Sequence, residues 1–285
     1  MSGEWHLAHD CVLPLDRPRL MGILNLTPDS FSDGGQFADP GAAVDHALRM
    51  VDEGAEIIDV GGESTRPGAA AVRADEQVRR VIPVIEKLAS QADVLISIDT
   101  TRAAVARCAI EAGAAIINDV SAGLDDDAML SLASETQAGL ILMHRLRPPS
   151  EDSFSDQYES PPEYSNVVRE VGIELGNRAR AAEEAGVRRA SIVLDPGLGF
   201  GKTVRQNYEL IQHSARLLQM GYPLLCAASR KSFIGHVAGV ETPSQRIAGS
   251  VAVAVVSFMM GVRLFRVHDV RAHHEALLVA EAIMR

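Results

Sequence analysis

Eight short runs of mainly apolar residues recur along the chain, each separated from the next by a longer stretch with helical spacing. Most runs are nearly continuous in Ile, Leu and Val, which is typical of strands covered on both faces. Strands that alternate with helices favour a parallel sheet with helical crossovers. The pattern therefore predicts an α/β fold, a single (β/α)8 TIM barrel, with strands at residues 20–26, 56–60, 94–99, 115–119, 139–143, 191–195, 223–227 and 263–267.

The length of the chain agrees with one barrel. Its 285 residues slightly exceed the roughly 250 that such a barrel needs, so residues 1–285 are expected to form one domain, with 1–19 as a lead-in. Gly54, Gly113 and Gly186 stand where helices should end before the next strand. A further helix is expected after Thr242, which would cap it, with proline at the first helical position. The clearest helical stretches are residues 40–53, 74–90, 101–112 and 166–185.

One segment breaks the alternation. Residues 145–165 follow the fifth predicted strand and contain four prolines, several acids and little apolar periodicity. A connection this long is unusual in a compact domain. Two interpretations stay open at this stage, a disordered insertion and a lid over an active site.

Composition excludes several classes of protein. A formal net charge of −11 opposes binding to nucleic acid, because an acidic surface repels phosphate backbones. The three cysteines are sparse and unpaired in spacing, which favours a reducing compartment. No signal peptide is evident, and the most apolar segment, residues 248–262, is too short to cross a membrane. We therefore expect a cytoplasmic protein in which residues 248–262 form a buried helix, packed on its own barrel or across a dimer.

Polar residues follow the predicted strands closely. In a (β/α)8 barrel all these strand ends meet at one face, where active sites are built. Capping of strand ends explains any one such residue, but it does not explain why every strand has one. The residues at or just after the strand ends include Asn25, Asp99, Asn118, Asp119, His144, Asp195, Lys231, Arg266 and His268.

These strand-end residues fall into two groups. Arg266 and His268 are two residues apart and should point to the same side, near Lys231. The loops after the seventh and eighth strands of barrels often bind phosphate. By contrast, Asp99, Asn118 and Asp195 offer donors and acceptors to a flat, nitrogen-rich ring. The two groups together predict a small substrate with an anionic part and a polar ring.

The glycine-rich segment and the histidines do not indicate a nucleotide site or a zinc site. The glycines of residues 197–203 do not match the spacing of a nucleotide P-loop, because proline occupies the first glycine position. The histidines show no zinc-like spacing, and His273 and His274 are expected to face solvent. Magnesium could still enter with a pyrophosphate and be held by Asn25 and waters.

At this point the sequence resembles a known family. Residues 21–35 (MGILNLTPDSFSDGG) and 59–68 (DVGGESTRPG) closely resemble two signatures of dihydropteroate synthases, which belong to the pterin-binding family. Shorter blocks at 98–100, 117–119, 195–202, 229–233 and 266–269 are similar to the remaining family motifs and occur in the same order. After His144 the sequence departs from the family pattern and continues as a longer, acidic segment.

The resemblance implies a reaction and a set of roles. The family condenses 6-hydroxymethyl-7,8-dihydropterin pyrophosphate with p-aminobenzoate, in folate biosynthesis, and its members are dimers and targets of sulfonamides. Asp99, Asp195, Lys231 and Arg266 would be the catalytic residues. By motif position, Asp99, Asn118, Asp195 and Lys231 would hold the pterin; Asn25, Arg66, Arg266 and His268 the pyrophosphate, with Mg2+ at Asn25; and Phe31, Thr65, Pro67, Phe200 and Ser232 the p-aminobenzoate.

Two rival functions remain at this stage. A pterin-dependent methyltransferase barrel would share the Asp, Asn and Asp residues of the ring site but would have no use for Arg66, Arg266 and His268. A catalytically silent pterin-binding protein is opposed by the presence of Asn25, Arg66 and Lys231. The loops at 27–35 and 63–68 are rich in Gly, Ser and Asp, so we expect them to be mobile without ligand and ordered with it.

Overall fold

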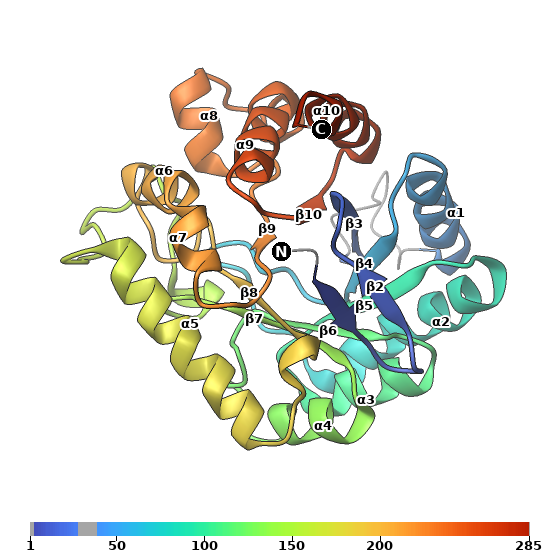
Figure 1. Cartoon of the computed structure of the whole chain (residues 1–285). Coiled ribbons are helices and arrows are strands. Elements are labelled where there is room, and N and C mark those ends of the chain that lie inside the picture. The colour runs from blue at the N-terminus through green and yellow to red at the C-terminus, as the bar shows by residue number, and fades with distance from the viewer. Residues whose placement is uncertain (1–2, 28–38, 285) are drawn as a thin grey trace.

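The computed structural model describes residues 3–27 and 39–284 and has a central barrel of parallel strands inside a ring of helices (Figure 1). Neighbouring strands follow the order β8-β7-β6-β5-β4-β3-β10-β9. This confirms the predicted (β/α)8 barrel. The strands are β3 (Arg19–Asn25), β4 (Ile57–Gly61), β5 (Leu95–Asp99), β6 (Ile116–Asp119), β7 (Gly139–Met143), β8 (Ile192–Asp195), β9 (Leu225–Cys226) and β10 (Leu264–Val267).

The barrel closes between β8 and β9. β9 is only two residues long, and its link to β8 is one isolated bridge between Leu194 and Leu224. The Leu194 amide also donates to the Pro223 carbonyl at 2.9 Å. The backbone therefore joins these two strands less extensively than β3 and β4, which pair over five residues.

The helices begin and end where local chemistry places them. The Asn166 side chain accepts from the Arg169 amide at the start of α5, and Thr203 forms a capping box with Gln206 at the start of α6. Gly54, Gly113 and Gly186 all have positive φ, as predicted for helix ends. The helices are α1 (Pro40–Asp52), α2 (Ala74–Gln91), α3 (Ala103–Glu111), α4 (Met129–Thr136), α5 (Val167–Glu184), α6 (Val204–Gln212), α7 (Ser214–Leu218), α8 (Ser232–Ala238), α9 (Ile247–Met259) and α10 (Val270–Met284).

The lead-in at the N-terminus contains a hairpin that the sequence patterns did not predict. Strands β1 (Glu4–His6) and β2 (Val12–Pro14) pair in antiparallel fashion across the amino-terminal end of the barrel (Figure 1). Trp5 is fully buried, and its indole nitrogen donates to the Ser191 carbonyl at 2.9 Å. Gly139 begins β7 beneath this hairpin, and a Cβ there would lie 2.4 Å from Leu7. Strands of three residues are too short to show a period, so only the packing reveals them.

Two local expectations were wrong. Thr242 makes no side-chain cap; Pro243–Gln245 form a short 3-10 turn, and α9 begins after it at Ile247. His273 is buried rather than solvent-facing, because its ring nitrogen bonds the Asp269 carbonyl one turn earlier at 2.7 Å. The helix expected over residues 248–262 forms as α9; one side of it is buried in the single chain, and on the other side Val256 and Met259 are 42% and 56% exposed.

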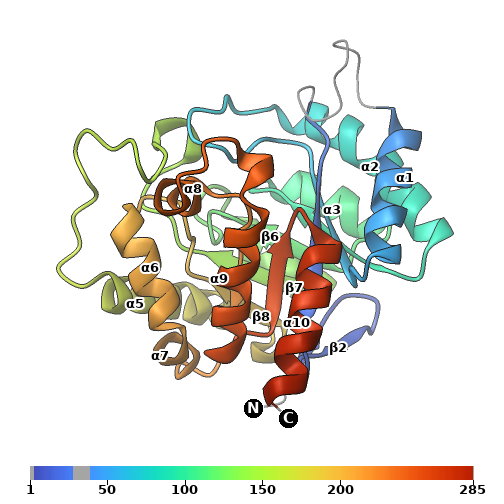
Figure 2. The ribbon, with the colours of Figure 1, turned by 90° about the horizontal axis from the view of Figure 1, so that it is seen from above.

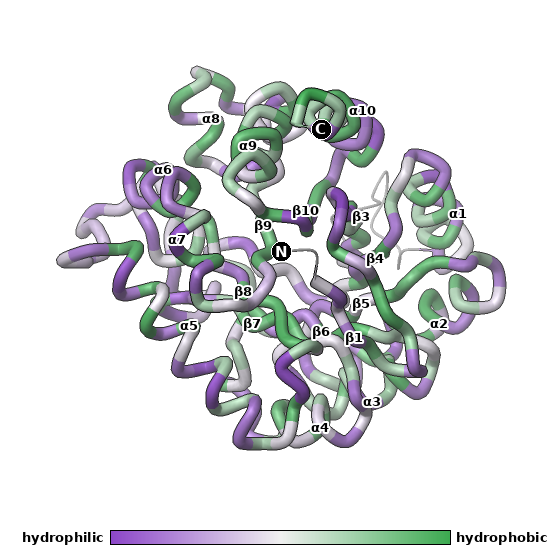
Figure 3. Tube along the Cα trace, viewed as in Figure 1, coloured by the Kyte–Doolittle hydropathy of each residue, from purple (hydrophilic) through white to green (hydrophobic). Residues whose placement is uncertain are grey.

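Hydropathy follows the layers of the fold. The strands are apolar along most of their length, and the helices alternate between apolar and polar residues around the ring (Figure 3). The turned view separates the two ends of the barrel, with the hairpin at one end and the long loops at the other (Figure 2). Within the described part of the chain, no helix is long and apolar enough to cross a membrane.

Candidate active site

Buried carboxylates and one arginine meet at the carboxyl ends of neighbouring strands. Arg266 of β10 donates from Nε to Asp59 at 2.6 Å and from Nη2 to Asp99 at 2.7 Å. The Asn118 amide of β6 also donates to Asp59, at 3.0 Å. These four residues come from β4, β5, β6 and β10, so the parallel sheet brings together groups that are far apart in sequence. We call them the carboxylate floor.

The carboxylate floor has unused acceptors. Among the described residues, Oδ1 of Asp59 and Oδ1 of Asp99 are buried without a hydrogen-bond partner. A buried acceptor without a donor costs free energy, about 1–3 kcal/mol for a neutral group and more for a charged one. Burial raises the pKa of Asp99 to about 7, although Arg266 opposes the shift. The floor is therefore suited to a ligand that presents ring N–H or amino groups.

Asp195 and Lys231 lie beside this floor. Asp195 ends β8, and its Oδ1 accepts from the Gly197 amide at 2.7 Å. Lys231 follows β9, donates to the Leu198 carbonyl, and lies 4.1 Å above the centre of the Phe200 ring. Burial lowers the pKa of Lys231 to about 8, with the Asp195 charge opposing the shift. Lys231, which is predicted to bind the pterin, therefore lies against Phe200, which is predicted to bind the second substrate.

Glycine is needed under this lysine. Gly199 has a φ of +83°, and a Cβ there would lie 2.7 Å from Cδ of Lys231. Gly197 has a φ of +67°, and a Cβ there would lie 1.8 Å from the His144 carbonyl oxygen. Both the backbone conformation and the close approach exclude larger residues. These glycines let the backbone lie against the Lys231 side chain and the end of β7.

The expected pyrophosphate ligands lie next to the floor. His268 follows β10 and bonds the Ser229 hydroxyl through its ring at 3.1 Å. Burial lowers the pKa of His268 to about 3, and the charges of Arg230, Arg266 and Arg66 lower it further. The ring is therefore neutral near pH 7. It can donate a hydrogen bond to an anion, while the positive charge comes from the arginines and Lys231.

Asn25 is the predicted metal ligand. It ends β3, and its Oδ1 would lie 3.3 Å from a Cβ on Gly61, which ends the adjacent β4. Within residues 3–27 and 39–284, no group of three or more His, Cys, Asp or Glu side chains could hold a metal. One amide oxygen fits a magnesium ion that takes most of its ligands from a bound pyrophosphate and water. It does not fit a resident metal centre.

The residues expected around p-aminobenzoate are only partly gathered. Thr65 and Pro67 lie in the loop after β4, and Arg66 between them is exposed. Ser232 begins α8, and its Oγ accepts from the Ser155 amide at 3.2 Å. Phe31 falls outside the described residues, as do residues 28–35 of the first expected mobile loop.

Sequence reasoning missed two features of the site. The first is Asp59, which belongs to the 59–68 motif and accepts hydrogen bonds from both Arg266 and Asn118. The sequence feature that could have identified it is a charged residue inside an apolar strand. Lys202 is fully buried, and its Nζ lies 2.9 Å from Nδ1 of His144 and 2.8 Å from the Phe200 carbonyl. Burial lowers the pKa of Lys202 to about 7.

One of the strand-end residues, Asp119, does not contribute to the site. Its carboxylate accepts from Ser121 and from the Gly123 amide and organises its own turn.

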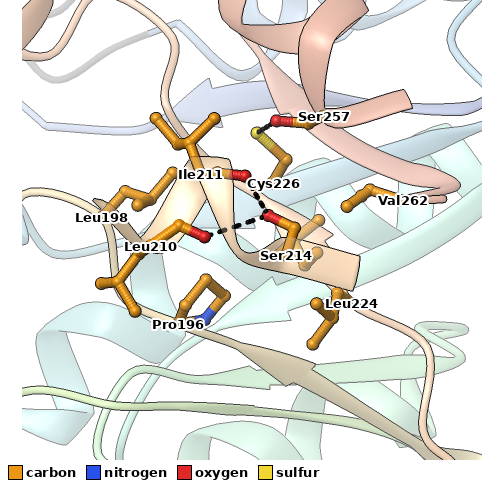
Figure 4. Close-up of a pocket in the computed structure, with 10 residues that line it drawn as sticks. Pro196, Leu198, Leu210, Ile211, Ser214, Leu224, Cys226, Ser257 and Val262 are labelled. Carbon is orange, nitrogen blue, oxygen red and sulfur yellow. Dashed lines mark hydrogen bonds between the residues drawn. The ribbon is translucent and has the colours of Figure 1, made fainter. Parts of the chain in front are cut away.

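A small pocket lies next to the loop after β8, between the barrel wall and helices α6 and α9 (Figure 4). Its lining is mostly apolar. The Ser214 hydroxyl donates to the Leu210 and Ile211 carbonyls, and the Cys226 thiol donates to Ser257 at 3.5 Å. Burial raises the pKa of Cys226 to about 11, so its thiol is unreactive near neutral pH. These groups are already paired, so the pocket is not suited to a polar substrate.

Comparisons with known proteins agree with this geometry. The model of the pterin binding enzyme family matches residues 21–268. A dihydropteroate synthase of Streptococcus pyogenes is 44% identical over 266 residues, which are 93% of this chain and 95% of the relative. The solved dihydropteroate synthase of Xanthomonas albilineans with 4-aminobenzoic acid superposes with a TM-score of 0.91 at 44% identity, covering 100% of this chain and 99% of the other. The Yersinia pestis dihydropteroate synthase with a sulfonamide drug superposes with a TM-score of 0.90 at 41% identity, covering 97% and 98%.

The barrel and its carboxylate floor define a pterin-binding enzyme. Within that class, the chain belongs to the dihydropteroate synthase family.

Proposed function

We propose that the carboxyl-end face carries out the dihydropteroate synthase reaction with a defined division of roles. The chain condenses 6-hydroxymethyl-7,8-dihydropterin pyrophosphate with p-aminobenzoate, giving 7,8-dihydropteroate and pyrophosphate. The observation that supports the roles most strongly is the pair of buried, unpartnered carboxylate oxygens beside Arg266. Asp99 and Asp195 would accept from the pterin ring, and Asn118 and Lys231 would complete its contacts.

The anionic part of the substrate would face the cations. Arg66, Arg266 and His268 would hold the pyrophosphate, with the neutral His268 acting as a hydrogen-bond donor. Arg266 uses Nε and Nη2 on the floor, and its Nη1 donates to no acceptor among the described residues. That nitrogen could reach the pyrophosphate while the rest of the side chain stays in place. Asn25 would supply one ligand to Mg2+ that enters with the pyrophosphate, where the ion would offset the negative charge.

Catalysis follows from these positions. The bond between the exocyclic carbon and the pyrophosphate oxygen breaks, and both bonding electrons leave with the pyrophosphate. Arg66 and Arg266 would stabilise the charge on the leaving group, and the carboxylates of Asp99 and Asp195 would stabilise the positive charge on the pterin. The amino nitrogen of p-aminobenzoate then bonds to the carbon and loses a proton. An aromatic amine is already a nucleophile, so no strong base is required.

The first test is a steady-state assay that couples pyrophosphate release to formation of dihydropteroate. The proposal expects both products in equal amounts and dependence on p-aminobenzoate. A pterin methyltransferase would release no pyrophosphate, and a silent pterin-binding protein would bind the ring without turnover. Binding of pterin without either product would therefore overturn the proposal.

Sulfonamides should compete with p-aminobenzoate in this enzyme. Thr65, Pro67, Phe200 and Ser232 are the residues expected around the second substrate, and the family relative from Yersinia pestis has been solved with a sulfonamide drug. Steady-state inhibition by sulfamethoxazole at varied p-aminobenzoate tests this. Inhibition that p-aminobenzoate cannot relieve, or no inhibition at millimolar drug, would show that the pocket differs.

We also propose that the chain works in the cytoplasm as a homodimer that uses α9 and α10. These two helices pack on one another, and both expose apolar side chains, namely Val256, Met259, Leu278, Val279 and Ile283, which are 42% to 77% exposed. Exposed apolar side chains on adjoining helices are typical of an interface between subunits. Sedimentation of wild-type protein and of Val279→Glu tests this; a wild-type monomer at micromolar concentration would contradict it.

A further inference from the structure

The long segment after β7 packs on the barrel as a strap over the carboxyl-end face. We use the name strap for residues 145–165. The Pro149 carbonyl in the strap accepts from the Gly68 amide at 2.8 Å, in the loop that carries Thr65 and Pro67. Tyr164 donates to the Gly201 carbonyl at 3.0 Å near its other end. These contacts decide between the two sequence interpretations, because a disordered insertion would not make them.

Asp152 fixes the strap to the loop after β8. It is 7% exposed, and its Oδ2 accepts from the Gly201 amide at 2.7 Å. Its Oδ1 accepts from the Tyr158 hydroxyl at 2.6 Å and from the Ser153 amide at 2.9 Å. Burial and the neighbouring Asp152 both raise the pKa of Tyr158, so its hydroxyl remains a donor. Both oxygens of this buried carboxylate are used within the protein, unlike those of Asp59 and Asp99.

Ser155 joins the strap to the site. Its backbone amide donates to Oγ of Ser232 at 3.2 Å, and its own Oγ accepts from Nδ2 of Asn207 at 3.0 Å. A hydroxyl group that accepts one hydrogen bond keeps its hydrogen to donate elsewhere. The Ser155 amide therefore occupies one lone pair of Ser232 and leaves the hydroxyl hydrogen for another acceptor.

We propose that Asp152 and Ser155 are positioning residues that make Ser232 a donor to the carboxylate of p-aminobenzoate. This rests on the proposed function, which places the second substrate at Ser232. Asn207 holds Ser155, Ser155 orients Ser232, and Asp152 fixes the strap against Gly201. The strap thereby favours a second substrate that ends in an anionic acceptor over a neutral one of the same size.

The experiment compares p-aminobenzoate with p-aminobenzamide, which keeps the amine but has no charge. Wild type, Ser155→Ala, Asp152→Asn and Ser232→Ala are assayed with both, at saturating pterin pyrophosphate. Ser155→Ala removes the acceptor that Asn207 holds but keeps the backbone amide, and Asp156→Asn, an exposed position on the same strap, is the control. We expect the KM for p-aminobenzoate to rise about fivefold to tenfold in Ser155→Ala and Asp152→Asn, as for a weakened hydrogen bond to a charged group. The KM for the pterin substrate should stay within about twofold in both, and the preference for the carboxylate over the amide should shrink in the same proportion.

The double variant Ser155→Ala/Ser232→Ala separates positioning from a structural role. If Ser155 acts through Ser232, adding its substitution to Ser232→Ala changes the KM no further. Additive effects, or equal rises in the KM values of both substrates, would overturn the inference. If Ser232→Ala itself leaves the KM for p-aminobenzoate unchanged, the proposed placement of the second substrate fails instead. A normal KM for p-aminobenzoate in Ser155→Ala together with a raised KM in Ser232→Ala would contradict the positioning role of the strap. It would leave the placement of the second substrate at Ser232 intact.

Discussion

The two ends of the barrel treat their buried charged groups in opposite ways. At the amino end, Arg19 is nearly buried and bonds the Pro14 carbonyl, Glu56 and Asp16, at 2.5 to 2.8 Å. The Trp5 indole and the Ala8 amide also have backbone partners there. At the carboxyl end, Asp59 and Asp99 keep buried oxygens without partners in the described part of the chain.

The difference shows which end the chain uses for stability and which for binding. Satisfied polar groups and a packed hairpin lower the free energy of the folded state without help from a ligand. Unsatisfied carboxylates raise it until a ligand supplies the donors. Substitutions at the amino end should therefore change the free energy of unfolding, and substitutions at the carboxyl end should change affinity and turnover.

The largest effect is expected from Asp195→Ala. Two hydrogen bonds from the pterin to a charged acceptor contribute roughly 1.5–3 kcal/mol each, so affinity should fall by about two to four orders of magnitude. The fold should survive, because within the described residues this side chain accepts a hydrogen bond only from the Gly197 amide. Calorimetry with the pterin substrate measures this, with the exposed Asp127→Ala as control. Near-normal affinity would rule out the role of Asp195 in binding the ring.

Trp5→Ala tests the other end. Trp5 is fully buried between the hairpin and the barrel, and removal of a buried tryptophan costs about 3–5 kcal/mol. Both KM values should remain normal under conditions where the variant is folded. Val12→Ala, on the exposed face of β2, should cost less than about 0.5 kcal/mol. Chemical denaturation gives these free energies of unfolding. A large change in either KM for Trp5→Ala would contradict the assignment of the amino end to stability alone.

The pH dependence of pterin pyrophosphate binding sharpens the comparison. The pKa of Lys231 is lowered to about 8, so this lysine loses its positive charge as the pH rises through that value. The pKa of Asp99 is raised to about 7, so this acid becomes neutral as the pH falls through it. Affinity should be greatest between these values and fall about tenfold by pH 9.5, as for one charge-assisted hydrogen bond.

Lys231→Arg is the control for the alkaline side, because arginine stays charged throughout this range. Titration calorimetry across the pH series should show the alkaline fall in the wild type and none in Lys231→Arg. An alkaline fall that persists in the variant would assign it to another group, such as Lys202, whose pKa is lowered to about 7.

The smallest effect concerns the loop after β4. Residues 63–68 were expected to be mobile without ligand, and the structure shows that both ends are held, by Glu63 with Gln77 and by Gly68 with Pro149. Hydrogen exchange should therefore slow on binding of pyrophosphate and pterin only at the amides of residues 64–66, while the Gly68 amide is protected in both states. Equal exchange at the amides of residues 64–66 in both states would contradict this.

Patterns of sequence predicted the barrel because each strand is an apolar run whose length and borders are local properties. They predicted that Asp99, Asn118, Asp195 and Arg266 would share one face, since parallel strands bring their ends together. They could not show that Arg266 binds Asp59, because that contact joins residues more than two hundred positions apart. Sequence patterns also could not predict the hairpin at residues 4–14 or the hydrogen bonds of Asp152 and Ser155. These features depend on tertiary packing and not on a hydrophobic periodicity in the sequence.

The weakly joined seam between β8 and β9 has a consequence for the whole molecule. Asp195 ends the strand on one side of it, and Lys231 follows the strand on the other. A pterin held by both residues, as proposed above, would link the two strands at the place where the backbone closes the cylinder with one bridge. Ligand binding that is confined to the closed cylinder adds to its resistance to unfolding in proportion to occupancy. In a cell short of its pterin precursor, the enzyme would therefore become easier to open at the same seam where it holds that precursor.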